Sequence, residues 1–274
     1  MPQRIKMLER DPNVRNKDFK EVNLGYSDEQ ALTEAKRCLH CKNPMCVTGC
    51  PVEVNIPEFV HQLATNNPAE AIKVIKSKSN LPAVCGRVCP QEKQCESKCI
   101  LGIKQEPIAI GNLERYAADW AAKNIKEESF DIKPNGIKVA VIGSGPAGLT
   151  CAGDLAKLGY DVTIFESLHD SGGVLRYGIP EFRLPVEVLD REVDSLKKLG
   201  IKFVFNYLIG RTKTVEDLIN EGFKAIFVGT GAGLPTFPGV EGENLNNIYS
   251  ANEFLVRINL MNAFQFPEYD TPVH

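Results

Sequence analysis

Two dense blocks of cysteine constrain this chain more than any other feature. They hold eight of the nine cysteines among its 274 residues. The blocks are Cys38, Cys41, Cys46 and Cys50, followed by Pro51, and then Cys85, Cys89, Cys95 and Cys99. Thiolates at such short spacings, with a proline after a cysteine, are typical ligands of cubane iron–sulfur clusters. The sequence therefore predicts a fold that brings these loops around metal clusters, and with them an electron path.

The rest of the composition excludes several other classes of protein. The formal net charge is −3, and lysine and arginine are scattered, which predicts neither a nucleic-acid nor a membrane-surface patch. No apolar run reaches the roughly 18–20 residues of a membrane-spanning helix. The N-terminus is charged and lacks the apolar stretch of a secretory signal. We therefore expect a cytoplasmic protein, in which clustered cysteines serve metal or redox chemistry and do not form disulfides.

The first half of the chain predicts helices and no strand. Residues 1–26 are polar and weakly patterned, which favours an arm that packs on something larger. Ser27 and Gln30 form a capping box, which predicts a helix over 28–37 ending at the first cysteine. Apolar spacing predicts further helices over 56–65, 69–77 and 111–124. We therefore expect an all-helical iron–sulfur domain over 1–130.

The pattern changes after a polar linker over 125–136. Short apolar strands are expected over 137–142, 162–166, 202–206 and 225–229, and helices over 147–158 and 186–199. Alternation of strands with helices predicts a parallel sheet with helical crossovers. The second domain, 131–274, is thus expected to be an α/β, Rossmann-like FAD-binding domain that is incomplete at its C-terminus.

Cysteine spacing alone suggests how the ligands divide. In two-cluster ferredoxins the fourth cysteine of a run serves the other cluster. This logic assigns Cys38, Cys41 and Cys46 to one cluster and leaves Cys85 as a possible fourth ligand. The other cluster would then hold Cys50, Cys89, Cys95 and Cys99. Zinc is the alternative, because C-x2-C pairs occur in zinc knuckles, but the x3, x4 and x5 gaps fit zinc poorly.

A dinucleotide-binding motif follows the linker. Gly143, Gly145 and Gly148 form G-x-G-x-x-G between an expected strand and an expected helix. The first glycine allows a tight turn, the second lets a pyrophosphate approach backbone N–H groups, and the third lets helix and strand pack closely. Glu166 ends the next strand, about 20 residues on, where a carboxylate binds the adenosine ribose. The motif with its acid predicts dinucleotide binding.

Two later stretches favour FAD over NAD. A long glycine-rich stretch over 171–185 has the composition of a segment that lines a flavin, and a Gly-Thr-Gly turn after the fourth strand returns backbone amides to the cofactor. Contact from two passes of the chain suits FAD better. Besides the motif glycines and Glu166, the expected cofactor-binding residues are Ser144, Pro146, Ala147, Gly173, Leu175, Arg176, Arg183, Gly229, Thr230 and Gly231.

Taken together, these motifs resemble one family. The two cysteine blocks, the Gly-Pro-Ala-Gly-Leu fingerprint and the stretch Gly-Val-Leu-Arg-Tyr-Gly-Ile-Pro-Glu-Phe-Arg-Leu-Pro are similar to the small (beta) subunit of NADPH-dependent glutamate synthase. They also resemble the large subunit of the NADH-dependent, electron-bifurcating ferredoxin:NADP oxidoreductase and the N-terminal module of dihydropyrimidine dehydrogenase. The resemblance covers nearly the whole chain and implies a helical domain with two [4Fe–4S] clusters followed by an FAD domain.

The resemblance also changes the expected ligand set. In that family a Gln or Glu on the helix after the second cysteine block completes one cluster. By resemblance, Glu114 would join Cys38, Cys41 and Cys46, and Cys85 would be spare. Spacing alone favours Cys85, so the two alternatives stay open. A carboxylate is a harder ligand than a thiolate and would shift the potential of that cluster.

The resemblance implies an oxidoreductase that passes electrons from NADPH through FAD and two clusters to a larger redox subunit, such as a glutamate synthase alpha chain or a ferredoxin or flavin subunit. Family members continue into a second dinucleotide domain for NADPH, whereas this sequence has no second fingerprint. We therefore expect a truncated chain. The alternatives are a non-enzymatic electron-transfer or scaffold fragment, and a subunit of a bifurcating ferredoxin:NADP oxidoreductase.

Overall fold

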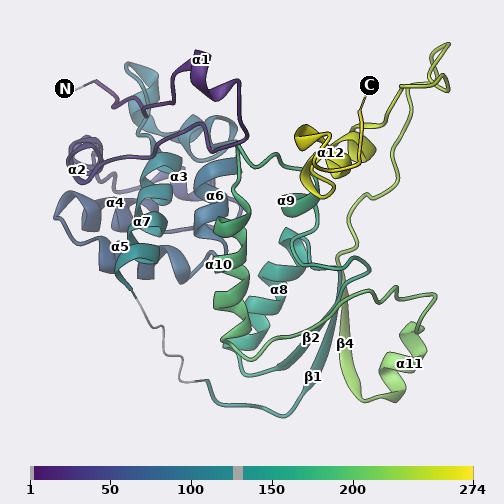
Figure 1. The fold of residues 1–274 in the computed structure, drawn as a ribbon. Coiled ribbons are helices and arrows are strands. Elements are labelled where there is room, and N and C mark those ends of the chain that lie inside the picture. Colours follow the sequence, from purple (N-terminus) through teal and green to yellow (C-terminus); the bar gives the residue numbers. More distant parts are fainter. Residues whose placement is uncertain (1–2, 126–131, 274) are drawn as a thin grey trace. The chain divides into compact units, whose positions relative to one another are not determined.

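The computed structural model describes residues 3–125 and 132–273 of the chain (Figure 1). The described chain forms two compact units. Unit 1 contains Met1–Ser129 together with Phe182–Leu184, and unit 2 contains Phe130–Glu181 and Pro185–His274. The middle of the expected linker, 126–131, lies outside the described residues.

The secondary-structure elements of the described part of unit 1 are helices and 3-10 turns, apart from an isolated antiparallel bridge between Glu9 and Asn23. Its elements are α1 (Pro12–Arg15), α2 (Asp28–Ala35), α3 (Met45–Thr48), α4 (Ile56–Ala64), α5 (Pro68–Lys76), α6 (Pro82–Val88), the 3-10 turns η1 (Gln91–Lys93), η2 (Glu96–Lys98) and η3 (Ile100–Ile103), and α7 (Ile110–Asn124). The capping box at the start of α2 is confirmed, because Ser27 Oγ accepts from Gln30 N and the Gln30 side chain accepts from Ser27 N. The apolar sides of α4, α5 and α7 supply the core, with Phe59, Ile75 and Leu113 fully buried.

The N-terminal arm, expected to pack on something larger, contacts the helices of its own unit. Arg4 forms an ion pair with Glu96 at 2.8 Å, and the backbone N–H of Ile5 donates to Glu34 Oε2 at 2.7 Å. The Tyr26 hydroxyl donates to the Ile5 carbonyl. At least this part of the arm therefore packs against its own unit.

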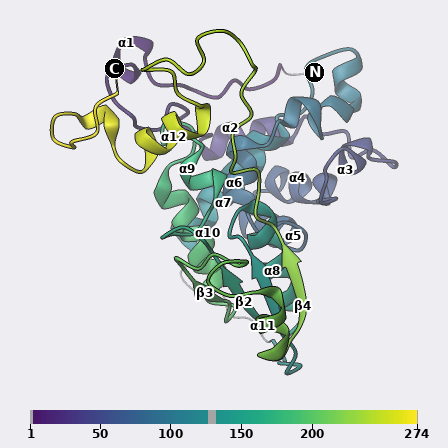
Figure 2. The ribbon, with the colours of Figure 1, turned by 90° about the vertical axis from the view of Figure 1, so that its right-hand side faces the viewer.

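Unit 2 is built on a parallel sheet of four strands in the order β3-β2-β1-β4 (Figure 2). The strands are β1 (Lys138–Ile142), β2 (Asp161–Phe165), β3 (Lys202–Val204) and β4 (Phe223–Val228). The helices are α8 (Pro146–Lys157), α9 (Val174–Tyr177), α10 (Val186–Lys197), α11 (Val215–Asn220) and α12 (Ala251–Asn259), with a 3-10 turn η4 (Ala263–Gln265). Strands β2 and β3 are added on one side of β1, and β4 is added on the other side. The crevice beside such a switch point, between β1 and β4, is where α/β folds bind ligands.

Both faces of the sheet are covered. Ala140 and Phe165 pack with Leu218 of α11 in a buried cluster on one face. Val141, which alternates with Ala140 along β1, lies beside α8 on the other face, where a Cβ on Gly148 would come within 3.2 Å of its side chain. Figure 1 shows α8 and α11 on opposite sides of the strands.

The fold class expected from the sequence, a helical iron–sulfur domain followed by a parallel α/β domain, is confirmed. All four expected strands and all six expected helices occur, with ends displaced by a few residues. The prediction missed α6, α11 and α12, as well as the four-residue helices α1, α3 and α9. Helix α6 is only seven residues long and α11 only six, so neither supplies enough turns for a clear apolar period.

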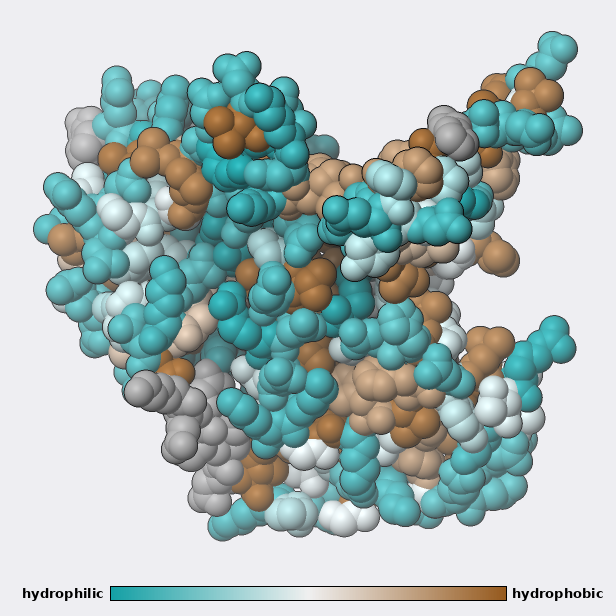
Figure 3. Space-filling model, in the orientation of Figure 1, coloured by the Kyte–Doolittle hydropathy of each residue, from teal (hydrophilic) through white to brown (hydrophobic). Residues whose placement is uncertain are grey.

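The segment after β4 exposes many apolar side chains. Figure 3 shows them as brown groups at the upper right, over 234–250. They are Leu234, Phe237, Val240, Leu245 and Ile248. Among the described helices, none is long and apolar enough to cross a membrane.

Leu218→Ala should destabilise unit 2, because Leu218 is fully buried beneath the sheet. We expect a loss of about 2–5 kcal/mol in unfolding free energy, measured from urea titrations followed by circular dichroism. The neighbouring Ile219, which is 56% exposed, offers a matched control. An equal loss for Ile219→Ala would contradict the assignment of α11 to the core.

Candidate functional site

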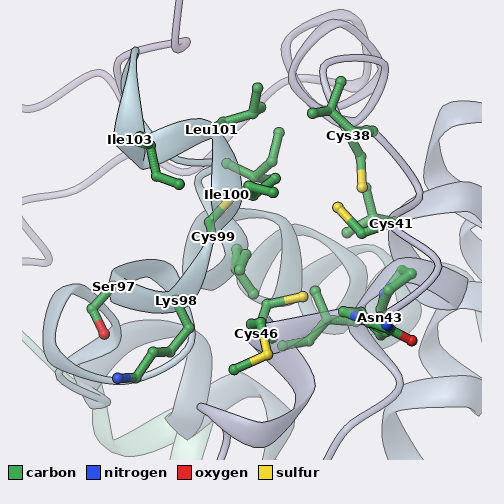
Figure 4. A pocket seen from close by; sticks show the side chains of 18 residues that line it. Cys38, Cys41, Asn43, Cys46, Ser97, Lys98, Cys99, Ile100, Leu101 and Ile103 are labelled. Atoms are coloured by element: carbon green, nitrogen blue, oxygen red, sulfur yellow. The ribbon is translucent and has the colours of Figure 1, made fainter.

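Four cysteine thiols line one cavity in unit 1. The cavity has a volume of about 320 Å³, and Cys38, Cys41, Cys46 and Cys99 lie in its wall (Figure 4). The rest of the lining is mainly apolar and includes Ile56, Val60, Ile100, Leu101, Ile108 and Ile110. We call these four residues the first cysteine group.

The remaining cysteines of the two blocks gather around Glu114. Cys50, Cys95 and Glu114 are close enough to act electrostatically on Cys89, which is hydrogen-bonded to Cys85. Cys50 and Glu114 also act on Cys95. We call Cys50, Cys85, Cys89 and Cys95 the second cysteine group, and Glu114 of α7 lies beside it.

A close crossing of two helices puts Glu114 there. A Cβ on Gly86 of α6 would lie 2.4 Å from the backbone nitrogen of Arg115 on α7. Only glycine permits this approach, since a side chain at that position has no space. Cys85 and Cys89 flank Gly86 on α6, so the crossing carries them to the turn of α7 that holds Glu114.

This grouping of side chains differs from the division of ligands expected from the sequence, which itself stays a prediction. The sequence placed Cys99 with Cys50, Cys89 and Cys95, and the resemblance placed Glu114 with Cys38, Cys41 and Cys46. The structure instead places Cys99 in the first cysteine group and Glu114 beside the second.

The physical reason lies in the two C-x3-C pairs. Cys46 lies within α3 and Cys50 just after it, whereas Cys95 and Cys99 flank η2. Gly49 brings these two turns together, because a Cβ there would lie 2.8 Å from Lys98 Cγ and 3.2 Å from Cys95 Cα. Each pair therefore contributes one thiol to each group. The sequence identified this sharing for Cys46 and Cys50 but not for Cys95 and Cys99.

Burial disfavours the thiolate form at two of these cysteines. Burial raises the pKa of Cys46 to about 11. Burial, followed by the nearby carboxylates of Glu96 and Glu114 and by Cys50, raises the pKa of Cys95 to about 12. Such thiols stay protonated at neutral pH unless a metal displaces the proton, since metal binding requires the thiolate.

The residues present fit iron–sulfur clusters. Four soft sulfur donors line one cavity of apolar walls, which suits a cluster shielded from water. Within residues 3–125 and 132–273, no three side chains of His, Cys, Asp or Glu meet at a point suited to a single metal ion. His40, within the first block, packs edge-on against His61 with ring centroids 5.2 Å apart.

A buried ion pair lies directly before the first cysteine block, and the sequence analysis did not predict it. Glu34 and Arg37 lie at the end of α2, and their side chains are 0% and 1% exposed. Glu34 Oε1 accepts from Arg37 Nη1 at 2.6 Å and from the Ala109 backbone N–H at 2.9 Å. Arg37 Nη2 donates to the Glu106 carbonyl at 2.8 Å. The residue before Cys38 is thus tied to the segment that leads into α7.

The glycine motif of unit 2 adopts the expected strand–turn–helix geometry. Gly143 has a φ of +98°, and a Cβ there would lie 2.4 Å from the Gly229 carbonyl oxygen. A Cβ on Gly148 would lie 1.9 Å from the Gly143 carbonyl oxygen. A Cβ on Gly145 would meet nothing within 4 Å. The first and third glycines are therefore needed by the fold, and the second leaves open space before the N-terminus of α8.

That helix N-terminus suits a phosphate group. Gly145 is the N-cap of α8, and no side chain caps it; Pro146 and Ala147 form the first turn. Uncapped backbone N–H groups and the helix dipole favour a negative charge at this point. The open space at Gly145 and the free cap are the features that a dinucleotide pyrophosphate requires.

Glu166 is buried, and the structure shows what holds it. Its Oε2 accepts from Ser144 N at 2.8 Å and from Ser144 Oγ at 2.6 Å, while Oε1 accepts from Leu168 N at 2.9 Å. Burial raises the pKa of Glu166, but the hydrogen bonds from Ser144 and Leu168 outweigh it and leave that pKa below its usual value. Glu166 is thus ionised beside the glycine turn. Ser144 serves as its partner, a role that the sequence reading did not assign.

Other expected cofactor residues divide into two sets. Gly229, Thr230 and Gly231 follow β4, and Gly229 N donates to the Ile142 carbonyl at 2.8 Å, so this turn touches the glycine motif. A Cβ on Gly173 would lie 2.9 Å from Gly145 Cα, and Leu175 is buried just after it.

The two arginines differ from these glycines. Arg176 forms ion pairs with Asp190 and, at 3.4 Å, with Asp170, and its Nε donates to the Ser171 carbonyl. Arg183 lies in Phe182–Leu184, which packs with unit 1, where the Phe182 carbonyl accepts from Val22 N at 3.0 Å. Their roles in flavin binding stay predictions.

Comparison with protein families matches both halves of the chain. Residues 15–126 match the family described as dihydropyrimidine dehydrogenase domain II, 4Fe-4S cluster. Residues 137–259 match the pyridine nucleotide-disulphide oxidoreductase family. In domain composition, the chain thus joins a region of a 4Fe-4S family to a region of the pyridine nucleotide-disulphide oxidoreductase family.

Curated relatives place it more narrowly. The glutamate synthase [NADPH] small chain of Escherichia coli (strain K12) is 36% identical over 255 residues, which cover 93% of this chain and 54% of the relative. The corresponding protein of Halomonas elongata is 36% identical, covering 89% and 52%. The NAD-dependent dihydropyrimidine dehydrogenase subunit PreT of E. coli (strain K12) is 38% identical, covering 79% and 53%. The chain is therefore homologous to glutamate synthase small chains over most of its own length, and it spans about half the length of these relatives.

Gly145→Ala should separate cofactor binding from folding. The added Cβ meets no protein atom but occupies the space before α8. We expect flavin affinity to fall on the order of tenfold or more, with an unchanged melting temperature. Gly148→Ala is the contrast, because its Cβ collides with the Gly143 carbonyl and should lower the melting temperature. Full flavin content in Gly145→Ala would argue against this cofactor position.

Glu34→Gln should destabilise unit 1 by about 3–5 kcal/mol, because it leaves the Arg37 charge buried without its partner. Urea unfolding measures the loss, and iron retention on dilution should fall with it. Glu70→Gln breaks the exposed pair with Lys73 and should leave stability unchanged. Equal stability of the two variants would show that the buried pair does not hold this unit together.

Proposed function

We propose that this chain binds FAD and two [4Fe–4S] clusters and carries electrons from NADPH to a larger redox subunit, as the names of its relatives suggest. One observation carries the proposal: a helical unit with two separate cysteine groups precedes a dinucleotide loop in the same chain. Homology favours an oxidoreductase over a scaffold fragment.

The proposed ligands follow the observed groups. Cys38, Cys41, Cys46 and Cys99 would hold one cluster, and Cys50, Cys89, Cys95 and Glu114 the other. Glu114 is preferred to Cys85 because the resemblance expects a carboxylate or amide ligand on this helix and Glu114 lies beside Cys89 and Cys95; the hydrogen bond between Cys85 and Cys89 further argues that the two thiols do not hold separate corners of one cubane. Cys85 also lies 3.8 Å from Ser79 Oγ, which gives it a local partner.

The residues of the chain would divide the work. Bound flavin converts two-electron hydride chemistry into single-electron transfer, which clusters conduct. The uncapped N-terminus of α8 would hold the pyrophosphate. Ionised Glu166, which also accepts hydrogen bonds from Ser144, would accept from the ribose hydroxyls. Ile56, Val60, Ile108 and Ile110 exclude water from the first cysteine group. The protein would thus position the cofactors, shield the clusters from water and place a charge beside the dinucleotide.

The test is the content of iron, acid-labile sulfide and flavin per chain, after purification without oxygen. About eight iron, eight sulfide and one FAD are expected. Zinc in place of iron would overturn the proposal. Iron without FAD would remove the flavin part and leave a cluster protein.

Ligand variants then test the two groups. Cys99→Ser and Glu114→Gln should each perturb one cluster only, and electron paramagnetic resonance of the reduced protein should show the other signal unchanged. Cys85→Ser serves as the matched control and should retain both signals. Loss of a cluster in Cys85→Ser with retention in Glu114→Gln would assign the ligand role to Cys85.

A further inference from the structure

A buried carboxylate lies directly beside the second cysteine group. Glu96 follows Cys95 in the chain and begins η2, and its side chain is 7% exposed. Its charge acts on the Cys95 thiol, because the pKa of that thiol is raised first by burial and then by the carboxylates of Glu96 and Glu114. In the first cysteine group, burial and neighbouring thiols raise the pKa of Cys46 instead. The electrostatic effect of Glu96 is thus evident at the second group.

The N-terminal arm supplies the positive charge that offsets this carboxylate. Arg4 Nη1 lies 2.8 Å from Glu96 Oε2 and also donates to the Pro107 carbonyl at 3.3 Å. The other carboxylate oxygen, Glu96 Oε1, accepts from the Gly111 backbone N–H at 3.2 Å, near the start of α7. Glu96 is therefore held by the arm through one oxygen and by α7 through the other.

The neighbouring ion pairs balance one another and do not involve this carboxylate. They lie where α6 and α7 cross, and they join Arg87 and Arg115 to Glu21 and Asp119. An arginine side chain stays protonated in proteins, so Arg4 supplies a fixed positive charge. Without Arg4, the charge of Glu96 would stay buried beside Cys95 and lose the cation that the structure pairs with it.

We propose that Arg4 of the N-terminal arm sets the reduction potential of the cluster in the second cysteine group by offsetting the charge of Glu96. The inference rests on the proposed function and deepens it, because it gives a role to a residue outside both cysteine blocks. Reduction adds one electron to a cluster, so a nearby negative charge disfavours it and a nearby positive charge favours it. Burial strengthens both effects, since little water screens them. Arg4 acts through Glu96 and is therefore a positioning residue, not a ligand.

The experiment is a redox titration of the cluster-loaded chain, followed by electron paramagnetic resonance, with a europium(II) chelate as the strongest reductant. Glu114→Gln identifies the signal of the second cluster. Arg4→Gln should make that cluster harder to reduce: we expect its equilibrium constant for reduction to fall on the order of tenfold, which is about 59 mV for a one-electron couple. The first cluster should keep its potential.

Three more variants separate charge from packing. Glu96→Gln should raise the potential of the second cluster, opposite to Arg4→Gln, and a general loosening of the unit does not give shifts of opposite sign. Arg4→Lys keeps the charge and should restore most of the parental potential. Arg10→Gln is the matched control, because it removes a cation of the same arm that pairs with Asp18 at 2.6 Å, and it should leave both potentials unchanged.

The outcomes that overturn the proposal are an unchanged second potential in Arg4→Gln, an equal shift in Arg10→Gln, or a shift of both clusters together. Downward shifts in both Arg4→Gln and Glu96→Gln would also overturn it. If Arg4→Gln does not assemble its clusters, Glu96→Gln decides alone, and no upward shift there rejects the proposal. Iron and sulfide are measured on every sample. Parental protein without clusters contradicts the proposed function, whereas loaded protein whose second potential ignores these charges contradicts only the role of Arg4.

Discussion

Two short turns, each with a cysteine at either end, are the constraint on which the helical unit depends. Cys46 lies within α3 with Cys50 just after it, and Cys95 and Cys99 flank η2, so each turn supplies one thiol to each cysteine group. The two groups therefore cannot be assembled independently. Gly49 lets the turns meet, and any side chain there would push them apart. This shared scaffold fixes the two groups in one rigid relation.

Ionic contacts hold the approaches to those turns. The Glu34–Arg37 pair is buried and bonded to three backbone groups outside α2, which satisfies charges that would otherwise be costly in the interior. Arg87 and Arg115 likewise share Glu21 and Asp119, at distances of 2.9–3.3 Å. Both arginines sit where α6 and α7 cross. The N-terminal arm supplies one of the acids, so it stabilises the helices that carry the second cysteine group.

Unit 2 solves a different problem, since it must present backbone to a ligand. In its glycine motif, a Cβ added to Gly145 would meet no protein atom, whereas a Cβ added to Gly143 or Gly148 would collide with the backbone. Ser144 and Glu166 then lock the turn to the end of β2. The glycine motif therefore both packs against the sheet and leaves space for a ligand, and the turn at Gly229 after β4 lies beside it.

Much of this was readable in the sequence because it is local. The capping box of α2, the alternation of strands and helices, and the G-x-G-x-x-G motif each depend on residues a few positions apart, and the structure has them. The eight candidate ligands were also identified by spacing and resemblance, though their roles stay predictions. Short helices such as α6 were not predicted, because seven residues are too few to show a helical spacing of apolar side chains.

Tertiary structure alone decided which candidate ligands lie together. Cys99 lies 53 positions from Cys46, and no spacing rule states which thiols meet across such a distance. The crossing at Gly86 and the contact at Gly49 settle it, since they depend on the absence of a side chain facing a particular backbone. The same holds for the Glu34–Arg37 pair, whose partners at 106 and 109 come from another part of the chain. The sequence determined which residues were available for the chemistry, and packing between distant segments determined their neighbours.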